Sequence, residues 1–415
     1  MCEKKRNLYL VGIGTGSEKM LTVRGREVLD ECECVIGADR MLDSVLPAGQ
    51  KEEKTVLREY RPEKILEWWN EHPEIGSAAV VLSGDTGFYS GAKKIRDVVE
   101  KGAADTKTEM IPGISSVVYF AAKLGVSWED AALISLHGKE GNFVRKIRRN
   151  RKTFLLLGGE GTAERFLNGL KEFGMDQVIL YAGKRLSYPE EEILTGSPRE
   201  MTPEQLSGLC VVFAENPDPE TKVCPHRKDE EFIRGKVPMT KAEVRAVSIA
   251  KLELTEDAVV YDVGAGTGSV SVEASLSGEN IRVYAVERNP EAMELLRENR
   301  RKFCAEGMRP IFGEAPKALE ELERPTHVFI GGSSGNLKEI LKTVCGKNPN
   351  VRIVINAISL ETIREVMEVA EEGLLKEPEI TQMSVSKSKT MGRYHMMMGQ
   401  NPVYIISSGG ERREA

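Results

Sequence analysis

Short runs of aliphatic and β-branched residues recur along the chain, and longer segments of mixed polarity separate them. This alternation predicts strands followed by helices, as in α/β domains. The predicted strands fall into two sets, which are 7–13, 78–84, 152–159, 177–183 and 210–216, then 259–264, 282–287, 326–332 and 352–358. Between the sets, three prolines in nine residues precede a cluster of charges. We therefore predict two domains, 1–217 and 231–408, a linker at 218–230 and a disordered tail at 409–415.

The composition of the chain limits the kinds of molecule that it is expected to bind. The chain has 415 residues with 29% charged and 40% hydrophobic residues, which is typical of globular proteins. The net charge of −6 gives no electrostatic reason to expect nucleic acid as a partner. No apolar run approaches the roughly 20 residues that cross a bilayer, so we expect a cytoplasmic protein without membrane contact. The seven cysteines are scattered without a C-x-x-C pair, which favours a reduced compartment and no metal site.

A glycine loop in the second half carries the main chemical signal. In "VVYDVGAGTGSVSVEAS", residues 259–275, Gly264, Gly266 and Gly268 stand between a predicted strand and a predicted helix. Glycine lets backbone amides approach a ligand, and a helix N-terminus favours polar or anionic groups. The dinucleotide fingerprint needs its third glycine where this chain has Ser269. The spacing therefore argues against NAD.

Acidic residues around the loop indicate another cofactor. Asp262 would repel a pyrophosphate but accept an ammonium group. Glu287 ends the next predicted strand, where a carboxylate can accept both ribose hydroxyls, and "GEAP", with Glu314 and Ala315, follows where an adenine should lie. Ribose and ammonium without pyrophosphate describe S-adenosylmethionine. A tight turn capped by an acidic residue would explain either feature alone, but not all three.

From about residue 230 onward the sequence resembles the decarboxylating carbon-15 methyltransferases of corrin biosynthesis. The segments that carry the resemblance are "DEEFIRGKVPMTKAEVRA", "DVGAGTGSVSVEA", "AVERNPEA", "GEAP" and "FIGGSSGNLKEIL". The resemblance implies a class I Rossmann-like fold and a cofactor site lined by Thr240, Gly264, Ala265, Gly266, Thr267, Gly268, Glu287 and Ala315. His327 stands where this family usually has an acidic residue, and we expect it to be hydrogen-bonded within the fold rather than catalytic.

The first half carries further glycine turns, in "LYLVGIGTGSEKMLTVRG", "VVLSGDTGFYSGAKK", "MIPGISSVVYFAAKLG" and "GKRLSYPEEEILTG". Together they resemble the tetrapyrrole methylase family, and within it the carbon-5 members. The resemblance implies a two-lobed (class III) α/β fold in which Gly12, Gly14 and Gly16 face the macrocycle. By the same resemblance, the cofactor is held by Asp85, Thr86, Gly87, Phe88, Ser115 and Ser116. Thr15 and Thr86 stand where the family commonly has proline.

The order of the two halves resembles the bifunctional C5,15-methyltransferases of corrin biosynthesis. The implied activity is methylation of a corrin precursor at C5 and C15, with decarboxylation of a ring acetate. Methylation needs mainly alignment of two ligands, which agrees with the lack of an evident Ser/His/Asp or Cys/His constellation. The resemblance also implies a symmetric homo-oligomer.

Residues that could contact an acid-rich substrate are Lys241, Arg245, Arg393 and His137. Lys241 and Arg245 stand four apart on one predicted helix face, and solvated surface charges are an equally good interpretation. The segment 143–152 holds six basic residues in ten and is either an exposed helix face or a rim that attracts the substrate. We expect the methionine run at 396–398 to form the core of a hairpin.

Two other function classes stay open at this point. A nucleic-acid or protein methyltransferase on the same class I core would need stacking aromatics and a basic groove, whereas aromatic residues make up only 6%. A non-catalytic sensor of S-adenosylmethionine would bind the cofactor without turnover.

Overall fold

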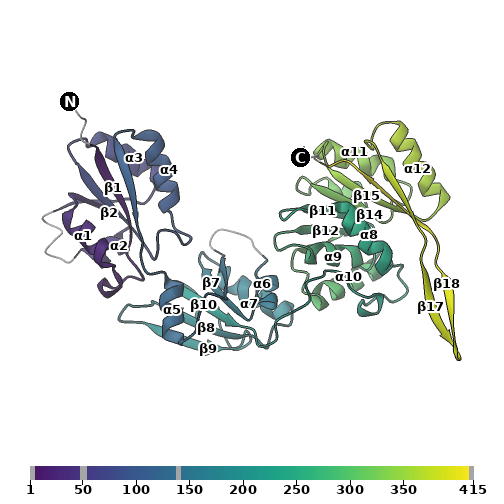
Figure 1. Cartoon of the computed structure of the whole chain (residues 1–415), viewed down its shortest axis with the longest axis horizontal. Helices are drawn as coiled ribbons and strands as arrows, with labels where there is room; N and C mark the ends of the chain where they lie inside the picture. Colours follow the sequence, from purple (N-terminus) through teal and green to yellow (C-terminus); the bar gives the residue numbers. More distant parts are fainter. Residues whose placement is uncertain (1–4, 47–53, 137–141, 411–415) are drawn as a thin grey trace. The chain divides into compact units, whose positions relative to one another are not determined.

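The computed structural model describes residues 5–46, 54–136 and 142–410, and the chain packs as two units (Figure 1). One unit comprises Met1–Glu140, Asn150–Lys171 and Met175–Pro219. The other comprises Gly141–Arg149, Glu172–Gly174 and Glu220–Ala415. Helices and strands alternate through both, so the predicted α/β class is confirmed, and each of the nine predicted strands is present.

The first unit begins with a parallel sheet of five strands in the order β3-β2-β4-β1-β5. The strands are β1 (Arg6–Gly12), β2 (Cys34–Gly37), β3 (Thr55–Arg58), β4 (Ser77–Leu82) and β5 (Thr106–Ile111). The helices are α1 (Val23–Glu31), α2 (Asp39–Val45), α3 (Pro62–Glu71) and α4 (Ala92–Gly102). Residues of α3 and α4 pack in the apolar cluster on one face, and residues of α1 and α2 in the cluster on the other. Because all strands run in parallel, the loops after β1, β4 and β5 leave from the same edge.

A second, mixed sheet completes this unit in the order β6-β7-β10-β8-β9. Its strands are β6 (Ala132–Ser135), β7 (Lys152–Leu157), β8 (Ile179–Lys184), β9 (Glu192–Gly196) and β10 (Cys210–Glu215). Helix α5 (Ser116–Leu124) packs on it through Phe120, which meets Phe154 and Phe213 in one cluster. Helix α7 (Thr162–Glu172) follows β7.

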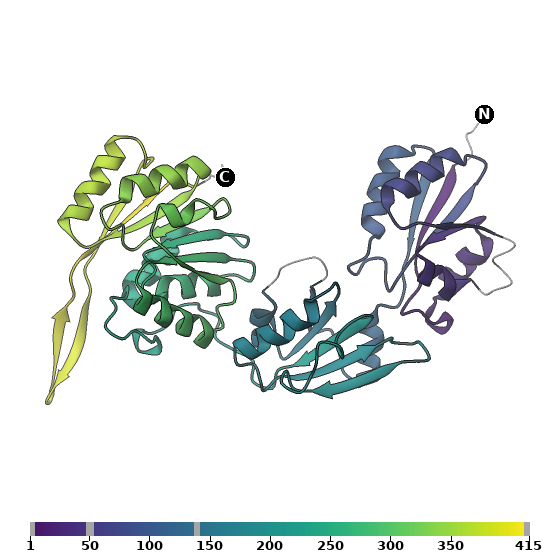
Figure 2. The ribbon, with the colours of Figure 1, turned by 180° about the vertical axis from the view of Figure 1, so that it is seen from behind.

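The second unit is built on a seven-stranded sheet in the order β13-β12-β11-β14-β15-β19-β16. The strands are β11 (Val259–Val263), β12 (Arg282–Glu287), β13 (Met308–Phe312), β14 (His327–Ile330), β15 (Arg352–Ala357), β16 (Glu379–Met383) and β19 (Val403–Ser408). Strands β11 to β15 pair in parallel, and β19 is antiparallel to both of its neighbours. Helices α8 (Ala242–Leu252), α9 (Ser269–Leu276) and α10 (Pro290–Lys302) cover one face, while α11 (Leu337–Lys347) and α12 (Leu360–Glu371) cover the other (Figures 1 and 2).

A hairpin of β17 (Ser386–Met391) and β18 (Tyr394–Gly399) projects from this sheet between β16 and β19 (Figures 1 and 2). All twelve residues of its two strands are exposed, including the three consecutive methionines 396–398. The prediction of a hairpin is therefore right, but the prediction that these methionines form its core is wrong. A two-stranded ribbon has no second layer under which to bury them.

Helix α6 (Phe143–Arg149) belongs to the second unit although it stands before β7 in the sequence. Phe143, Val144 and Ile147 are buried, and the guanidinium of Arg145 is paired with Glu220. Glu306 accepts hydrogen bonds from the backbone N–H groups of Val144 (2.8 Å) and Arg145 (3.3 Å) at the start of the helix. The basic segment 143–152 is therefore not a fully exposed face, because one side of α6 is buried.

No helix within the described residues is both long and apolar enough to span a membrane.

Glu306 predicts a measurable pH dependence of stability. Its desolvated carboxylate has a pKa raised from 4.5 to about 8. Between these values the folded state keeps a proton that the unfolded chain has released, so stability falls as pH rises, by at most ~1.4 kcal/mol per pH unit. Glu306→Gln keeps an acceptor but no longer titrates. We expect a flatter stability profile from pH 5 to 8 by calorimetric unfolding than for Glu298→Gln, which changes an exposed carboxylate on α10. Equal slopes for the two variants would contradict this assignment.

Candidate functional site

The glycine loop lies between β11 and α9, where the sequence predicted it. Gly264, Gly266 and Gly268 all have positive φ, at 73°, 57° and 76°. At Gly264 a Cβ atom would lie 2.8 Å from the carbonyl oxygen of Gly332 in the loop after β14. Glycine is required there by both backbone conformation and space. The loop thus presses closely on the neighbouring loop at the carboxyl edge of the sheet.

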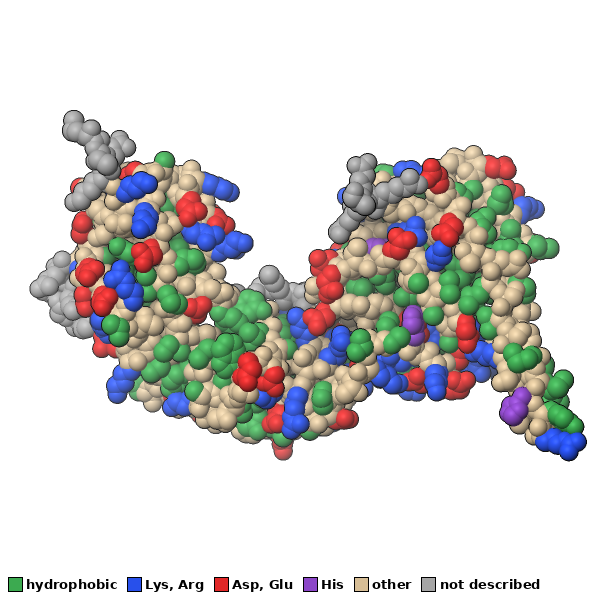
Figure 3. All heavy atoms as spheres, viewed as in Figure 1, with side chains coloured by type: hydrophobic (Ala, Val, Ile, Leu, Met, Phe, Trp, Pro, Cys, Tyr) green, Lys and Arg blue, Asp and Glu red, His purple; other side chains and the backbone are tan. Residues whose placement is uncertain are grey.

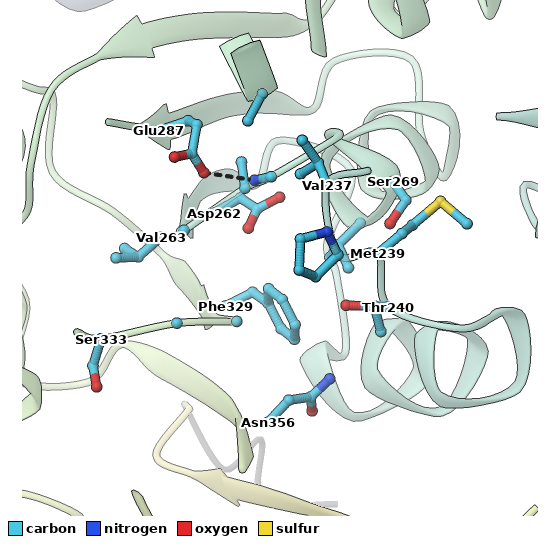
Figure 4. Close-up of a pocket in the computed structure, with 18 of the residues that line it drawn as sticks. Val237, Met239, Thr240, Asp262, Val263, Ser269, Glu287, Phe329, Ser333 and Asn356 are labelled. Atoms are coloured by element: carbon cyan, nitrogen blue, oxygen red, sulfur yellow. Dashed lines mark hydrogen bonds between the residues drawn. The ribbon is translucent and has the colours of Figure 1, made fainter. Parts of the chain in front are cut away.

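A cavity of about 730 Å³ opens at this edge (Figure 4). Most of the residues that the sequence assigned to the second cofactor site line it, namely Thr240, Asp262, Gly264, Ala265, Gly266, Glu287, Glu314 and Ala315. Thr267 and Gly268 do not line it, and Thr267 is buried behind the loop with a hydroxyl that has no partner among the described residues. The structure therefore brings together segments from the ends of β11, β12 and β13 and the start of α8.

Asp262 is the buried charge of the cavity. Its side chain is 1% exposed, and Oδ2 accepts a hydrogen bond from the hydroxyl of Ser271. Oδ1 has no hydrogen-bond partner in the part of the chain that the structure describes. Burial raises the pKa of this carboxyl to about 7. An unpaired buried carboxylate oxygen is costly, so the site fits a ligand that brings a cationic donor such as an ammonium group.

Glu287 lies at the end of β12 and shapes the loop as well as the cavity. Its Oε2 accepts a hydrogen bond from the backbone N–H of Gly266 (2.8 Å), drawn in Figure 4, and its Oε1 accepts one from Asn289 (2.7 Å). An ionised carboxylate has about four acceptor positions, so both oxygens keep capacity for a diol. The residue fits a ribose contact that is held in place before the ligand arrives.

The loop after β13 supplies the next wall, with Gly313, Glu314 and Ala315. Glu314 forms an ion pair with Arg288 (2.7 Å) across the cavity mouth. Ala315 is 9% exposed, so this wall is mainly backbone and a small apolar side chain. Such a wall fits a flat heterocycle.

Lys241 and Arg245 differ in environment although they stand one turn apart. Arg245 is 0% exposed and donates to Glu273 Oε1 (2.5 Å), to the carbonyl of Thr240 (2.6 Å) and to the carbonyl of Arg227 (2.6 Å). The prediction that Arg245 contacts a substrate carboxylate is therefore wrong, because its donors are used inside the fold. Lys241 lines the cavity, and its ammonium has no partner within the described residues.

Other predicted contacts lie elsewhere. Arg393 is at the turn of the exposed hairpin, donates to the hydroxyl of Tyr394 (2.8 Å) and does not line the cavity, so its predicted role near the site is wrong. His137 lies outside the described residues. His327 is 6% exposed, and its ring nitrogens lie 2.7 Å from the hydroxyl of Thr326 and 3.3 Å from the carbonyl of Glu253. Burial lowers its pKa, which agrees with a neutral structural histidine at the start of β14.

In the first unit, three glycine turns meet at the carboxyl edge of the parallel sheet. A Cβ atom on Gly12 would lie 2.7 Å from both the N of Gly113 and the carbonyl oxygen of Gly84. Asp85 ties two of the turns together, because its carboxylate accepts from the N–H groups of Gly87 (2.7 Å) and Gly113 (3.1 Å). The predicted residues of these turns thus form one edge of the first sheet.

The remaining predicted residues of this unit frame the same edge. Ser115 caps α5 by accepting from Val117 N–H, whereas Ser116 is the first helical residue and not the cap. Thr86 is buried, and Phe88 packs against the apolar cluster of the mixed sheet. The loop with Gly14 and Gly16 contacts the segment after β8, where Thr15 donates to the hydroxyl of Ser187 (2.8 Å).

Comparison with known proteins finds a different family for each half of the chain. The family described as "Precorrin methyltransferase domain" matches residues 231–408, and the family described as "Tetrapyrrole (Corrin/Porphyrin) Methylases" matches residues 7–202. With the glycine loop and its acidic partners, these matches define the class: the chain is an S-adenosylmethionine-dependent C-methyltransferase.

Individual relatives identify the family of the second half of the chain more narrowly. A probable cobalt-precorrin-6B C(15)-methyltransferase (decarboxylating) of Pyrobaculum calidifontis is 43% identical over 188 residues, which are 44% of this chain and 95% of the relative. The corresponding Salmonella typhimurium enzyme is 39% identical over 43% of this chain and 94% of its own length. The chain therefore belongs to the precorrin methyltransferase family. Among solved structures, a precorrin-6y C5,15-methyltransferase from Geobacter metallireducens is 40% identical, with a TM-score of 0.42 over 44% of this chain and 97% of that chain.

Several cavity residues were not found from the sequence. They come from the ends of β14 and β15, from the loops that follow these strands and from the base of the hairpin, and they are Phe329, Ser333, Asn356, Ile358, Val385 and Gln400. In the view of Figure 4, Asn356 and Phe329 stand below Asp262 and Glu287. Phe329 and Ser333 lie in the quoted segment "FIGGSSGNLKEIL" but were not singled out, and no motif marks the other four, because apolar and amide residues near strand ends are common in any α/β sheet.

The contrast between Arg245 and Lys241 is testable by stability. Arg245→Met leaves the buried carboxylate of Glu273 without its main partner, so we expect a loss of ~3–5 kcal/mol in the free energy of unfolding. Lys241→Met removes a partly exposed charge, and we expect a change within about 0.5 kcal/mol. Urea unfolding of the full chain followed by far-ultraviolet circular dichroism gives both values. Equal effects would contradict the distinction drawn here.

Proposed function

We propose that the chain methylates a corrin-ring precursor at two carbons. Residues 231–408 would methylate C15 and decarboxylate a ring acetate, which releases CO₂ and leaves a methyl group. The names of the relatives give C(15) methylation and decarboxylation for those proteins. Residues 1–217 would methylate C5. The single observation that carries the C15 assignment is the cavity in which Asp262, Glu287 and the 313–315 wall stand around the glycine loop.

The protein's contribution to methylation is mainly alignment. The sulfonium cofactor supplies the methyl group, and Asp262 would hold its ammonium end while Glu287 holds its ribose. Fixing two reactants in a productive geometry is worth up to ~7–11 kcal/mol of the barrier. Lys241 would hold a carboxylate of the substrate, since it lines the cavity and is not engaged with another described side chain.

Decarboxylation asks for a dry environment around the departing carboxylate. Loss of CO₂ leaves an electron pair that the conjugated ring takes up, and desolvation of the carboxylate favours this step. Phe329 and Val403 give the cavity apolar surface near the end of β14 and the start of β19. A proton must then reach the new methyl carbon, and no residue of the cavity is assigned to deliver it.

A second methyl-donor site in the first unit is supported by the meeting of its three glycine turns. Backbone amides and small side chains line that edge, and Asp85 fixes two of the turns. Two sites of different fold on one chain favour this assignment over a nucleic-acid or protein methyltransferase. A non-catalytic sensor is ruled out if the purified chain methylates a corrin precursor. We also propose a cytoplasmic location, in keeping with the six described cysteines, which are all unpaired.

The number of cofactor sites is the first quantity to measure. Titration calorimetry of the full chain with S-adenosylhomocysteine should give two sites per chain. Glu287→Gln should lose or weaken one of them at least tenfold while leaving the other unchanged, because only one unit contains Glu287. A wild-type stoichiometry of one would contradict the proposal for the first unit, and loss of both sites in the variant would contradict their independence.

We also propose that the chain forms a homo-oligomer. The hairpin supports this, because Met391, Tyr394 and the methionines 396–398 expose large apolar side chains along a narrow ribbon (Figure 3). Exposed apolar surface of this kind marks an interaction site.

Sedimentation velocity tests the role of the hairpin. We expect the wild-type chain to sediment as an oligomer and the double variant Met396→Lys/Met398→Lys to sediment as a smaller species, because charge on the ribbon disfavours burial. Leu209→Lys, an exposed leucine of the first unit, serves as the control and should leave the assembly intact. A monomeric wild-type chain, or a double variant with unchanged sedimentation, would refute this role.

A further inference from the structure

Two large aliphatic side chains stand exposed beside the cavity of the second unit. Ile358, in the connection after β15, is 73% exposed, and Leu360, the first residue of α12, is 79% exposed. Ile358 lines the same cavity as the glycine loop and Asp262. We name the pair Ile358 and Leu360 the apolar lip.

The backbone under the lip is fixed by local hydrogen bonds. Ser359 is the N-cap of α12, and its side chain accepts a hydrogen bond from the N–H of Thr362 (3.2 Å). On the strand side, Asn356 donates to the hydroxyl of Ser248 on α8 (3.0 Å). The lip is therefore presented by an ordered turn between two anchored positions.

The helix α12 does not need Leu360 for its own packing. Val366 and Val369 are buried in the core under the sheet, and Ile363 packs against the same cluster. Leu360, three residues before Ile363, is 79% exposed and takes no part in this cluster. A polar residue would serve a helix start equally well, so the aliphatic side chain points to a contact with something outside the fold.

The other walls of the cavity restrict what that contact can be. Opposite the polar cofactor end, the lining includes the apolar residues Val385 and Val403, and Lys241 contributes an ammonium without a described partner. A guest that satisfies all of these groups has an extended apolar face and carboxylates at its margin. A conjugated macrocycle with acid side chains has this chemistry, whereas nucleic acid carries phosphates in place of carboxylates and peptides lack an extended flat face.

We propose that the apolar lip is the platform on which the face of the tetrapyrrole rests, and that it selects for a macrocycle over smaller polycarboxylates. This inference rests on the proposed function of the same site. Lys241 and the apolar lip bind different parts of the substrate. The ammonium of Lys241 binds a carboxylate at the edge of the macrocycle, and Ile358 and Leu360 contact the ring face at the mouth of the cavity.

The test compares three variants with the wild-type chain. Ile358→Ser/Leu360→Ser removes the apolar contact from exposed positions and should leave folding intact. We expect its KM for cobalt-precorrin-6B to rise about tenfold or more, with an unchanged affinity for S-adenosylhomocysteine. Ile358→Leu/Leu360→Ile keeps the apolar surface and should restore most of the affinity. Met367→Ser, at a half-exposed position of the same helix that does not line the cavity, should behave as wild type.

A binding experiment distinguishes recognition of the macrocycle from recognition of its carboxylates. Uroporphyrin, a fluorescent macrocycle with eight carboxylates, should bind the wild-type chain and bind the serine double variant about tenfold more weakly. Mellitic acid, a small hexacarboxylate, should not distinguish the two.

Each outcome has a distinct meaning. If the wild-type chain fails to methylate the precursor, the proposed function falls before the lip is tested. If it methylates and the serine double variant has the same KM and the same affinity for uroporphyrin, the platform is refuted while the function stands. A double variant that changes only the sedimentation coefficient would show that a second copy covers the lip, which also refutes the platform.

Discussion

The ion pair between Arg245 and Glu273 organises the second unit. Both side chains are completely buried, so each charge depends on the other and on the hydrogen bonds around it. Arg245 holds the carbonyl of Thr240 at the cavity, and Glu273 lies on the helix that the glycine loop opens. Glu273 also receives hydrogen bonds from His226 and from the backbone of Arg227. One buried contact thus fixes two segments that border the cavity.

The same network continues beyond the cavity. Arg227 pairs with Glu220, and Glu220 pairs in turn with Arg145 on α6. A charge buried in this way is satisfied only when its partners come from defined places in the chain. Side chains that do not line the cavity therefore help to position the residues that do. They stabilise this arrangement because each buried charge needs its partner in place.

Local sequence patterns predicted those residues of the site that stand at the end of a single strand. The glycines of 264–268, Asp262 and Glu287 each stand at a strand end, and parallel strands bring such ends together. Burial could not be predicted in the same way. Arg245 has a helical spacing to Lys241 that suits two surface cations, and only the fully buried Glu273, 28 positions away, shows why it is internal. Likewise, the exposure of Met396 depends on a ribbon that leaves the sheet, and its residue type indicated the opposite.

The membership of α6 in the second unit means that no single cut in the sequence separates the two units. The helix precedes β7 in the sequence, yet it belongs to the second unit, and Phe143, Val144 and Ile147 are buried. A chain divided in the connection after β10 would leave α6 on the other fragment, and Glu306 would lose the backbone N–H groups of Val144 and Arg145 from which it accepts hydrogen bonds. A fragment that begins after β10 therefore lacks part of the second unit.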